Sequence, residues 1–186
     1  MTEPQTNISD AGTGRKKAKI CKMLSDEVVT AMAKATWESS SIGQEERRRH
    51  EEEQRLWANP EVGDEMPDGS VYAGISPNTG KQMFAMPQDA DVTKSFNEAA
   101  KYAQKLNEEK TLGHDDWHVP TKEELNVLFN NRAAIGGFNL TGSYHAGYYW
   151  SSSPYRDSSA WGQRFSDGDR YFHLGRDYDS SVRCVR

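Results

Sequence analysis

The hydrophobic pattern from residue 70 onward changes from strand-like to helical and then back to strand-like. A hairpin is predicted first, because short apolar runs at 70–75 and 81–85 flank a Pro-Asn-Thr-Gly turn. Two segments with helical spacing follow, and the remainder of the chain is β-like. Two helices between an N-terminal hairpin and a C-terminal run of strands predict an α+β fold.

The two central helices are predicted from different features. Apolar residues at helical spacing predict the first helix over 93–109. The second helix begins after Pro120, because Thr121 and Glu124 form a T-x-x-E capping box. Leu125 is expected on the buried face of this second helix.

The β-like C-terminal part is predicted to form one sheet. Asp167-Gly168 is a strong two-residue turn pattern between two of its strands. The expected strands are residues 148–152, 160–166 and 170–174, with 182–185 closing the sheet.

The first 60 residues are organised differently. Residues 1–20 are polar and are expected to be a flexible tail, and residues 21–60 a helical appendage. A helix over 26–38 carries one apolar stripe, whereas a second over 44–57 is almost entirely charged until its end. The stripe consists of Val28, Val29, Met32, Ala33 and Trp37. It must bury against the main domain at 66–186, another copy or a different protein, so oligomerisation or docking is expected.

Composition and charge argue against several classes of protein. The formal net charge of −5 disfavours nucleic acid or an anionic membrane as a partner. No apolar run approaches the roughly 18 residues of a membrane span, and the N-terminus lacks the apolar core of a signal peptide. We therefore expect synthesis in the cytoplasm, with cytoplasm or phage particle left open as the final site. The two cysteines, Cys21 and Cys184, do not have a zinc spacing and are expected to be free thiols.

The segment 147–186 is dense in Tyr, Trp, Phe, Arg, Ser, Asp and Gly. This composition is typical of a paratope, in which rigid aromatics supply contact area, small polar residues supply hydrogen bonds and Arg anchors the ligand. Nothing comparable elsewhere in the chain suggests catalysis. The sequence therefore predicts a binding surface on a scaffold.

Four blocks in this order resemble a bacterial and phage family with a C-type-lectin-like fold. They are Trp117-x-Val-Pro-Thr-x-x-Glu-Leu125, Tyr149-Trp150-Ser151-Ser152, Ala160-Trp161 with Phe165-Ser166-Asp167-Gly168, and Val182-Arg183-Cys184-Val185-Arg186. From Asp68 to Arg186 the chain is similar in style to the variable proteins of diversity-generating retroelements. The resemblance implies a lectin-like domain of the formylglycine-generating-enzyme type.

The resemblance also implies a route to sequence variation. In such systems a reverse transcriptase copies a template repeat, mutates its adenines, and the copy overwrites the 3′ end of the gene. A mutated AAY codon becomes NNY, which encodes Tyr, Phe, His, Leu, Arg, Ser, Gly and Asp but not Lys, Glu, Gln, Met or Trp. Residues 155–160 and 169–181 use only the permitted set. The varied surface is expected to bind a protein ligand or cell-surface receptor.

By this resemblance, two clusters are expected to bind the ligand. The variable residues are Tyr155, Arg156, Asp157, Ser158, Ser159 and Gly162 in one cluster, and Asp169, Tyr171, Phe172, His173, Leu174, Arg176, Asp177 and Tyr178 in the other. The scaffold residues are Trp117, Pro120, Trp150, Ala160, Trp161, Phe165, Val182 and Cys184. Tyr155, Tyr171, Phe172 and Tyr178 are expected to act as anchors, with Arg156 and Arg176 binding carboxylates.

An ordinary half-buried strand is the alternative interpretation of 170–174. Phe172 and Leu174 alternate with Tyr171 and His173, so this alternative makes Phe172 and Leu174 core residues. Exposure of all four side chains would instead support a binding face. The matching alternative function is a non-diversified structural module that assembles into a phage or bacterial complex.

No enzyme activity, metal or cofactor is expected. The metal-capable residues over 114–118 are interpreted as a polar loop, and Asp167-Gly168-Asp169 as a turn without the EF-hand pattern. The calcium motifs of sugar-binding lectins are missing. The oxidase that names the fold depends on paired cysteines, whereas this domain holds only Cys184, which is expected to be buried.

Overall fold

The computed structural model describes residues 26–142 and 147–186. The tail predicted over 1–20 and the thiol of Cys21 therefore lie outside the described residues. The chain divides into two compact units, and the second of these spans Glu53–Arg186. This second unit contains both sheets and the helices that lie between them in the chain.

The N-terminal helices are α2 (Asp26–Ser39) and α3 (Ser41–Ala58), and only Ser40 separates them. The Ser40 side-chain oxygen accepts a hydrogen bond from the Gly43 amide at 3.1 Å, which caps α3 three residues earlier than the sequence predicts. A Cβ at Gly43 would stand 2.1 Å from the Trp37 carbonyl oxygen. Glycine is therefore required where the two helix ends approach each other.

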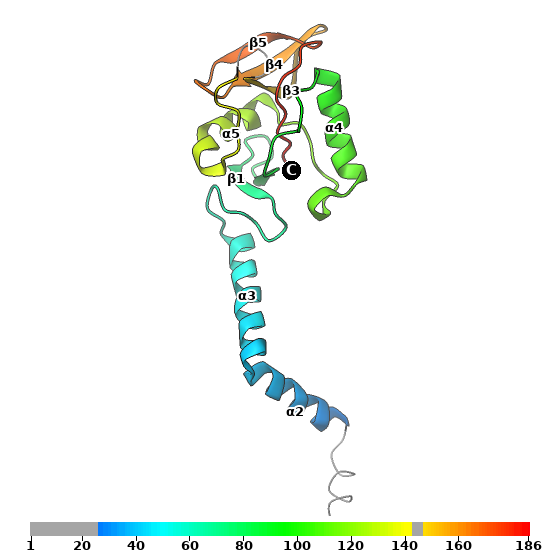
Figure 1. Ribbon diagram of the computed structural model, residues 1–186, viewed down its shortest axis with the longest axis vertical. Helices are drawn as coiled ribbons and strands as arrows, with labels where there is room; N and C mark the ends of the chain where they lie inside the picture. Colours follow the sequence, from blue (N-terminus) through cyan, green and yellow to red (C-terminus); the bar gives the residue numbers. More distant parts are fainter. Residues whose placement is uncertain (1–25, 143–146) are drawn as a thin grey trace, which may run out of the picture. The chain divides into compact units, whose positions relative to one another are not determined.

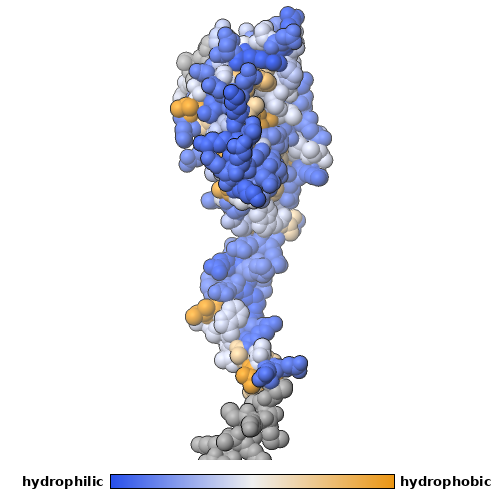
Figure 2. Space-filling view, turned by 90° about the vertical axis from the view of Figure 1, so that its right-hand side faces the viewer, coloured by the Kyte–Doolittle hydropathy of each residue, from blue (hydrophilic) through white to orange (hydrophobic). Residues whose placement is uncertain are grey.

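The predicted apolar stripe on α2 is exposed. No residue of α2 is buried, and Val28, Val29, Met32 and Trp37 keep 41, 52, 60 and 49% of their surface accessible. Figure 2 shows hydrophobic groups interrupting the otherwise hydrophilic surface of this helical region. The stripe is thus an unburied apolar surface within its own unit.

The second unit has the predicted α+β architecture (Figure 1). A two-stranded antiparallel hairpin lies at one end and a three-stranded antiparallel sheet, in the order β3-β4-β5, at the other, with helices on either side. The elements are β1 (Val71–Ile75), β2 (Gln82–Ala85), α4 (Phe96–Glu108), η1 (Thr111–Gly113), α5 (Lys122–Ile135), β3 (Tyr148–Arg156), β4 (Ser159–Arg164) and β5 (Arg170–Gly175).

Capping residues determine where both helices begin. In α5 the Thr121 side-chain oxygen accepts from the Glu124 amide at 3.2 Å, and the Thr121 amide donates to the Glu124 carboxylate at 2.9 Å, as the capping box predicts. Helix α4 begins at Phe96, later than predicted, because Ser95 forms a second capping box with Glu98. A local motif therefore overrides the apolar periodicity at this start.

Strand β3 is buried on both faces and separates two halves of the core. Tyr148 and Trp150 pack with the apolar face of α4, including Ala103. Tyr149 points the other way and packs with Phe165 and the buried residues of α5. The sheet is thus clamped between the two helices, and its far end is left to form a surface.

The prediction that residues 182–185 close the sheet as a strand is wrong. This segment makes only isolated bridges, pairing Val185 with Ala85 and His118, while Ser181 pairs in parallel with Tyr149. It passes between the hairpin and the sheet, so it cannot keep one strand partner for its whole length. Its side chains are nevertheless core, because Val182, Cys184 and Val185 are all fully buried.

Arg183 explains how a charged residue is accommodated in this buried segment. Its side chain has no exposed surface and forms an ion pair with Asp89 at 2.7 Å. It also donates to the carbonyl oxygens of Met86 at 3.0 Å and Gly137 at 2.7 Å. The guanidinium thus ties three separate loop and terminal segments together, since its donors are satisfied by partners from each.

Candidate ligand-binding face

A β-bulge in β5 decides which side chains reach the outer face of the sheet. Ala160 pairs with Leu174 and Gly162 pairs with Tyr171, so β5 contains one residue more than β4 between these pairs. Phe172 and His173 are therefore both exposed, while Tyr171 and Leu174 on either side pack against the core. Strict alternation would bury both Phe172 and Leu174, and a fully exposed strand would expose all four side chains from 171 to 174. The structure of β5 matches neither expectation.

Rings from all three strands meet on this outer face. We call Tyr155, Trp161, Phe172 and His173 the aromatic patch. The ring centroid of Tyr155 lies 4.8 Å from that of Phe172 and 4.9 Å from that of His173. The ring centroids of Trp161 and Phe172 are 5.4 Å apart. Tyr155 and Phe172 each keep 37% of their surface exposed. A contiguous exposed cluster of this kind is uncommon on a monomer surface and typically marks a binding site.

The length of β3 brings Tyr155 into the patch. The strand continues to Arg156 rather than ending at residue 152, and its register with β4 is irregular around Pro154. Tyr155 therefore reaches the rings of β4 and β5 from the outermost part of β3. Proline at such an irregular position is expected, since it donates no ladder hydrogen bond.

Three cations border the aromatic patch. The Arg156 guanidinium lies 5.1 Å from the Tyr155 ring, and Lys122 and Arg170 lie 5.0 and 5.8 Å from the Trp161 ring. Lys122 is the first residue of α5, and its amide donates to the Ser153 hydroxyl at 3.0 Å, which fixes this helix start against β3. Cations held over aromatic faces are attracted by the ring quadrupole.

Three of the remaining predicted positions line a separate polar hollow. Its volume is about 590 Å³, and its lining includes Asp157, Arg176 and Asp177 beside Ser95, which caps α4, and Glu98 of α4. The Arg176 guanidinium lies 4.7 Å from the Phe96 ring, and the Arg176 amide donates to the Ser158 carbonyl. The two predicted clusters therefore do not correspond to two surfaces, because members of each contribute to this hollow.

The structure divides the predicted variable residues by exposure. The exposed ones are Tyr155, Arg156, Asp157, Ser158, Asp169, Phe172, His173, Asp177 and Tyr178, and the half-buried ones are Tyr171 and Arg176. The assignment of Ser159, Gly162 and Leu174 to the ligand-binding surface is wrong, because all three are buried. At Gly162 a Cβ would lie 2.8 Å from a Leu174 methyl group, so the interior there is tightly filled.

The predicted scaffold residues are buried with one exception. Trp117, Pro120, Trp150, Ala160, Phe165, Val182 and Cys184 all lie in the interior. Trp161 is only partly buried and belongs to the aromatic patch instead. Lys122 and Arg170 were not predicted as site residues, since contact with the patch depends on a tertiary arrangement that no local motif reports.

Two carboxylates of the β4–β5 turn, Asp167 and Asp169, are engaged by neighbouring side chains. The Tyr148 hydroxyl donates to Asp169 at 2.7 Å, and burial together with this hydrogen bond raises the pKa of Tyr148 to about 12. Arg164 donates two hydrogen bonds to Asp167, at 2.9 and 2.6 Å. These two pairs close the β4–β5 turn, whereas neither Arg156 nor Arg170 is held in an ion pair within the described residues.

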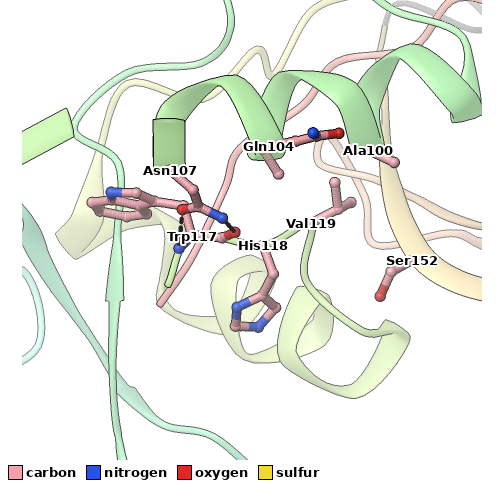
Figure 3. Close-up of a pocket in the computed structure, with 8 residues that line it drawn as sticks. Ala100, Gln104, Asn107, Trp117, His118, Val119 and Ser152 are labelled. Atoms are coloured by element: carbon pink, nitrogen blue, oxygen red, sulfur yellow. Dashed lines mark hydrogen bonds between the residues drawn. The ribbon is translucent and has the colours of Figure 1, made fainter. Parts of the chain in front are cut away.

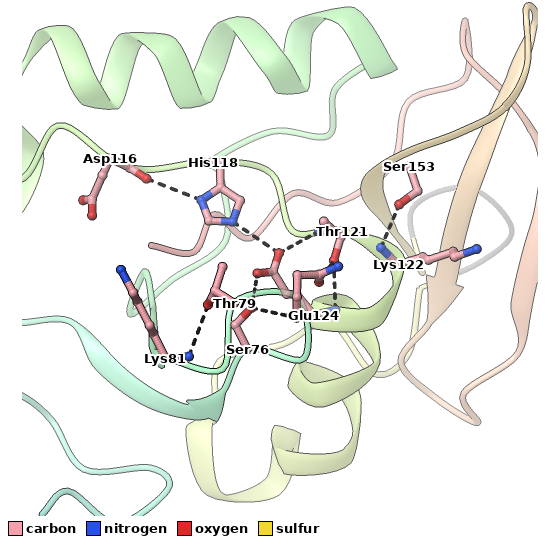
Figure 4. A network of polar contacts seen from close by, with 10 residues as sticks. Ser76, Thr79, Lys81, Asp116, His118, Thr121, Lys122, Glu124 and Ser153 are labelled. Atoms are coloured by element: carbon pink, nitrogen blue, oxygen red, sulfur yellow. Dashed lines mark hydrogen bonds and ion pairs between the residues drawn. The ribbon is translucent and has the colours of Figure 1, made fainter.

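A polar network centred on Glu124 supports the fold behind the sheet (Figure 4). The buried Glu124 carboxylate accepts from the Ser76 hydroxyl at 2.6 Å and contacts the His118 ring at 3.2 Å. Burial alone raises the pKa of Glu124, but hydrogen bonds from His118, Ser76 and the Thr121 amide outweigh it and lower the pKa to about 2. The same hydrogen bond has the opposite effect on its partner, because it stabilises the charged imidazole and raises the pKa of His118. Ser76, His118 and the Thr121 amide thus hold the carboxylate in place, which gives it a structural role.

A second hollow, of roughly 400 Å³, lies between α4 and the loop before α5 (Figure 3). Its polar residue Asn107 is already used, because its side chain accepts from the Trp117 amide at 2.7 Å and donates to the Trp117 carbonyl at 2.9 Å. Ala100 and Val119 supply much of the remaining wall, and the His118 ring points away from α4 in Figure 3. Gln104 and Ser152 also line this hollow.

Cys184 is buried, and burial raises the pKa of its thiol to about 12, so the reactive thiolate is scarce. Over residues 26–142 and 147–186, no group of three or more His, Cys, Asp or Glu side chains is arranged to hold a metal ion. None of the helices in these ranges is both long and apolar enough to cross a membrane.

Comparison with known proteins identifies the domain. No curated protein matches the chain. A model of the Lcl C-terminal domain family matches residues 73–186, which run from within β1 through the three-stranded sheet and the buried terminal segment. The fold and the match agree, and the chain belongs to the Lcl C-terminal domain family, a family of C-type-lectin-like ligand-binding modules.

Proposed function

We propose that this protein recognises a protein ligand, such as a cell-surface receptor, through the aromatic patch on the outer face of β3, β4 and β5. The observation that carries the proposal is the exposure of Tyr155, Phe172 and His173 together beside Trp161. Aromatic side chains bury large areas at a small cost in conformational entropy, which makes them frequent hot spots of protein interfaces.

The fold beneath the patch suits a recognition surface. Leu174 and Ala160 lie inside the sheet, and Trp150 fills the core under it. The rings outside therefore rest on a packed layer and lose little freedom on binding, because they already touch one another. A pre-organised surface of this kind favours binding without rearrangement.

Selection from a displayed library of random, disulfide-constrained peptides would test recognition by the patch. We expect enriched peptides to bind the intact protein and to lose most affinity for a Tyr155→Ala/Phe172→Ala variant. An Ile75→Ala/Val92→Ala variant is the matched control, since these residues are 50 and 63% exposed and lie outside the patch. Enrichment of peptides that bind both variants equally would refute the proposal.

We further propose that the patch is diversified by adenine-directed mutagenic retrohoming. Supporting this, residues 155–160 and 169–181 use only amino acids that NNY codons encode, and most of the exposed predicted positions fall in these segments. NNY codons cannot encode Trp150, Trp161 or Gln163. Trp150 and Gln163 are buried, whereas Trp161 would be a fixed member of the patch.

Sequencing the DNA that flanks the gene would test diversification. We expect an imperfect repeat of the 3′ end near a reverse-transcriptase gene, with mismatches confined to template adenines at codons of the exposed positions. A flanking region without such a repeat would leave a fixed binding surface and favour the alternative, a structural module of a phage or bacterial complex.

The exposed stripe on α2 specifically favours a second role in assembly. Val29 and Met32 are among the most exposed apolar residues of the described chain. We propose that this stripe joins copies of the protein or docks it on a larger complex, which would present several patches together and raise avidity. We also propose that the protein is not an enzyme and needs no cofactor, which the buried, unreactive thiol of Cys184 supports.

A further inference from the structure

We propose that the epitope bound by the aromatic patch is acidic, with carboxylates placed beside an apolar centre. This inference rests on the proposed function and specifies the chemistry of the partner protein. The apolar centre is supplied by the clustered rings, which meet edge-to-face or at a tilt, and the charge by Arg156 on one border and Arg170 with Lys122 on the other.

The two arginines on these borders have unused binding capacity. Among the described residues, neither Arg156 nor Arg170 forms an ion pair, in contrast to Arg164, which is held by Asp167. Arg170 donates only a long hydrogen bond, 3.4 Å, to the Lys122 carbonyl. Both side chains are exposed, so their remaining N–H groups are open to a ligand.

Cation–π contacts with the rings position these guanidinium groups. Arg156 lies over Tyr155 and Arg170 over Trp161, so the planar groups are held at the edges of the patch. A guanidinium presents paired N–H donors that match the two oxygens of a carboxylate. A ligand group that approaches from solvent therefore meets an apolar surface with carboxylate-binding donors at its sides.

The charge distribution favours an acidic protein over a highly charged polysaccharide. The chain as a whole has a formal net charge of −5, which repels an extended polyanion. The positive charge is confined to a few groups around aromatic rings, rather than forming a continuous basic stripe. Aromatic centres with Arg at the border are typical of protein interfaces.

The peptide selection described above can also test this inference. We expect enriched peptides to contain Asp or Glu next to an apolar or aromatic residue, and an Arg156→Gln/Arg170→Gln variant to bind them about tenfold more weakly. The loss should shrink as salt is raised, because steering by border charges is screened. A Lys101→Gln/Lys105→Gln variant removes the same charge from exposed positions of α4 and should bind like the unmodified protein.

Synthetic peptides separate the possible outcomes. The best acidic peptide should bind more tightly than its counterpart with Asn and Gln in place of Asp and Glu, and both should depend on Phe172. Peptides that require Phe172 but ignore both arginines would overturn the acidic epitope while leaving the proposed function intact. Peptides that ignore Phe172 would overturn both. Heparin fragments that bind through the same two arginines more tightly than any acidic peptide would also overturn the inference.

Discussion

At the scale of single residues, the buried charges are the most demanding feature of this fold. Arg183 has no exposed side-chain surface, yet an ion pair and several carbonyl oxygens surround it. Glu124 is similarly enclosed by hydrogen-bond donors. Because a buried charge is costly without its partners, each of these residues should tolerate replacement poorly.

Replacing Arg183 with alanine should destabilise the protein by about 3–5 kcal/mol, because Asp89 and several carbonyls would lose their partner. Urea unfolding at neutral pH would measure the change. Arg156→Ala, on the exposed border of the patch, should alter the free energy of unfolding by no more than about 0.5 kcal/mol. Equal effects of the two substitutions would contradict the structural role of Arg183.

Glu124 should make the free energy of unfolding depend on pH in the acidic range. Its pKa is lowered to about 2 in the folded protein, so its stabilisation is complete above the unfolded pKa near 4.5 and is lost as pH falls toward 2. The raised pKa of His118 acts in the opposite direction, so its contribution is full below the unfolded pKa and declines as pH rises through the folded one. The pair is most stabilising between these two windows.

Comparison of the unmodified protein with Glu124→Gln would measure this dependence. The difference in unfolding free energy should be about 2–3 kcal/mol near pH 5.5 and should diminish toward pH 2. Glu123→Gln in the same turn of α5 is the control, since the Glu123 side chain keeps 42% of its surface accessible and pairs with Lys122 at 3.6 Å. A Glu124→Gln difference that stays constant across this range would disprove the assignment.

At the scale of secondary-structure elements, β5 has separate inner and outer roles. Its bulge allows Phe172 and His173 to face solvent in succession, while Tyr171 and Leu174 pack inside. Leu174 is fully buried against the core that includes Trp150. Neighbouring positions of one strand should therefore respond very differently to the same substitution.

Leu174→Ala should cost about 2–5 kcal/mol of stability, because it removes buried methyl groups and leaves a cavity. Phe172→Ala should cost less than about 1 kcal/mol, although it removes a larger side chain, since that ring is 37% exposed on the outer face. Thermal or chemical unfolding of both variants provides the comparison. A larger loss for Phe172→Ala would mean that the strand has the opposite orientation.

Elements that depend on a local motif could be predicted from the sequence, whereas features that depend on pairing between strands could not. The start of α5 follows from Thr121 and Glu124, which interact within one helical turn. The bulge of β5 could not be read from its residues, because it depends on pairing with Gly162 and Ala160 of β4. The paratope-like composition located the patch, but the burial of Leu174 and the exposure of Trp161 required the three-dimensional arrangement.

At the scale of the whole molecule, the chain combines a packed recognition domain with an exposed helical stripe. Residues 73–186 match the family model, whereas α2 lies before this match. The lectin-like domain therefore accounts for the folded core, and the stripe of α2 needs an explanation of its own. Assembly through α2 would supply one.

Met32→Glu should abolish any self-association mediated by α2, because it introduces a charge into the apolar stripe. Sedimentation of the full chain over a range of concentrations would measure the assembly state. Ala31→Glu, which adds the same charge one position away on a different side of the helix, should preserve it. Sedimentation as a monomer by the unmodified chain at all concentrations would exclude self-association and leave docking to another protein.

The bulge of β5 also bears on how readily this surface can evolve. Because Leu174 and Tyr171 maintain the interior, the side chains at 172 and 173 can be exchanged without altering the residues that hold the sheet together. Folding stability and the chemistry of the outer surface thus depend on different positions of the same short strand. Substitutions at positions 172 and 173 can therefore accumulate during evolution while the free energy of unfolding stays nearly the same.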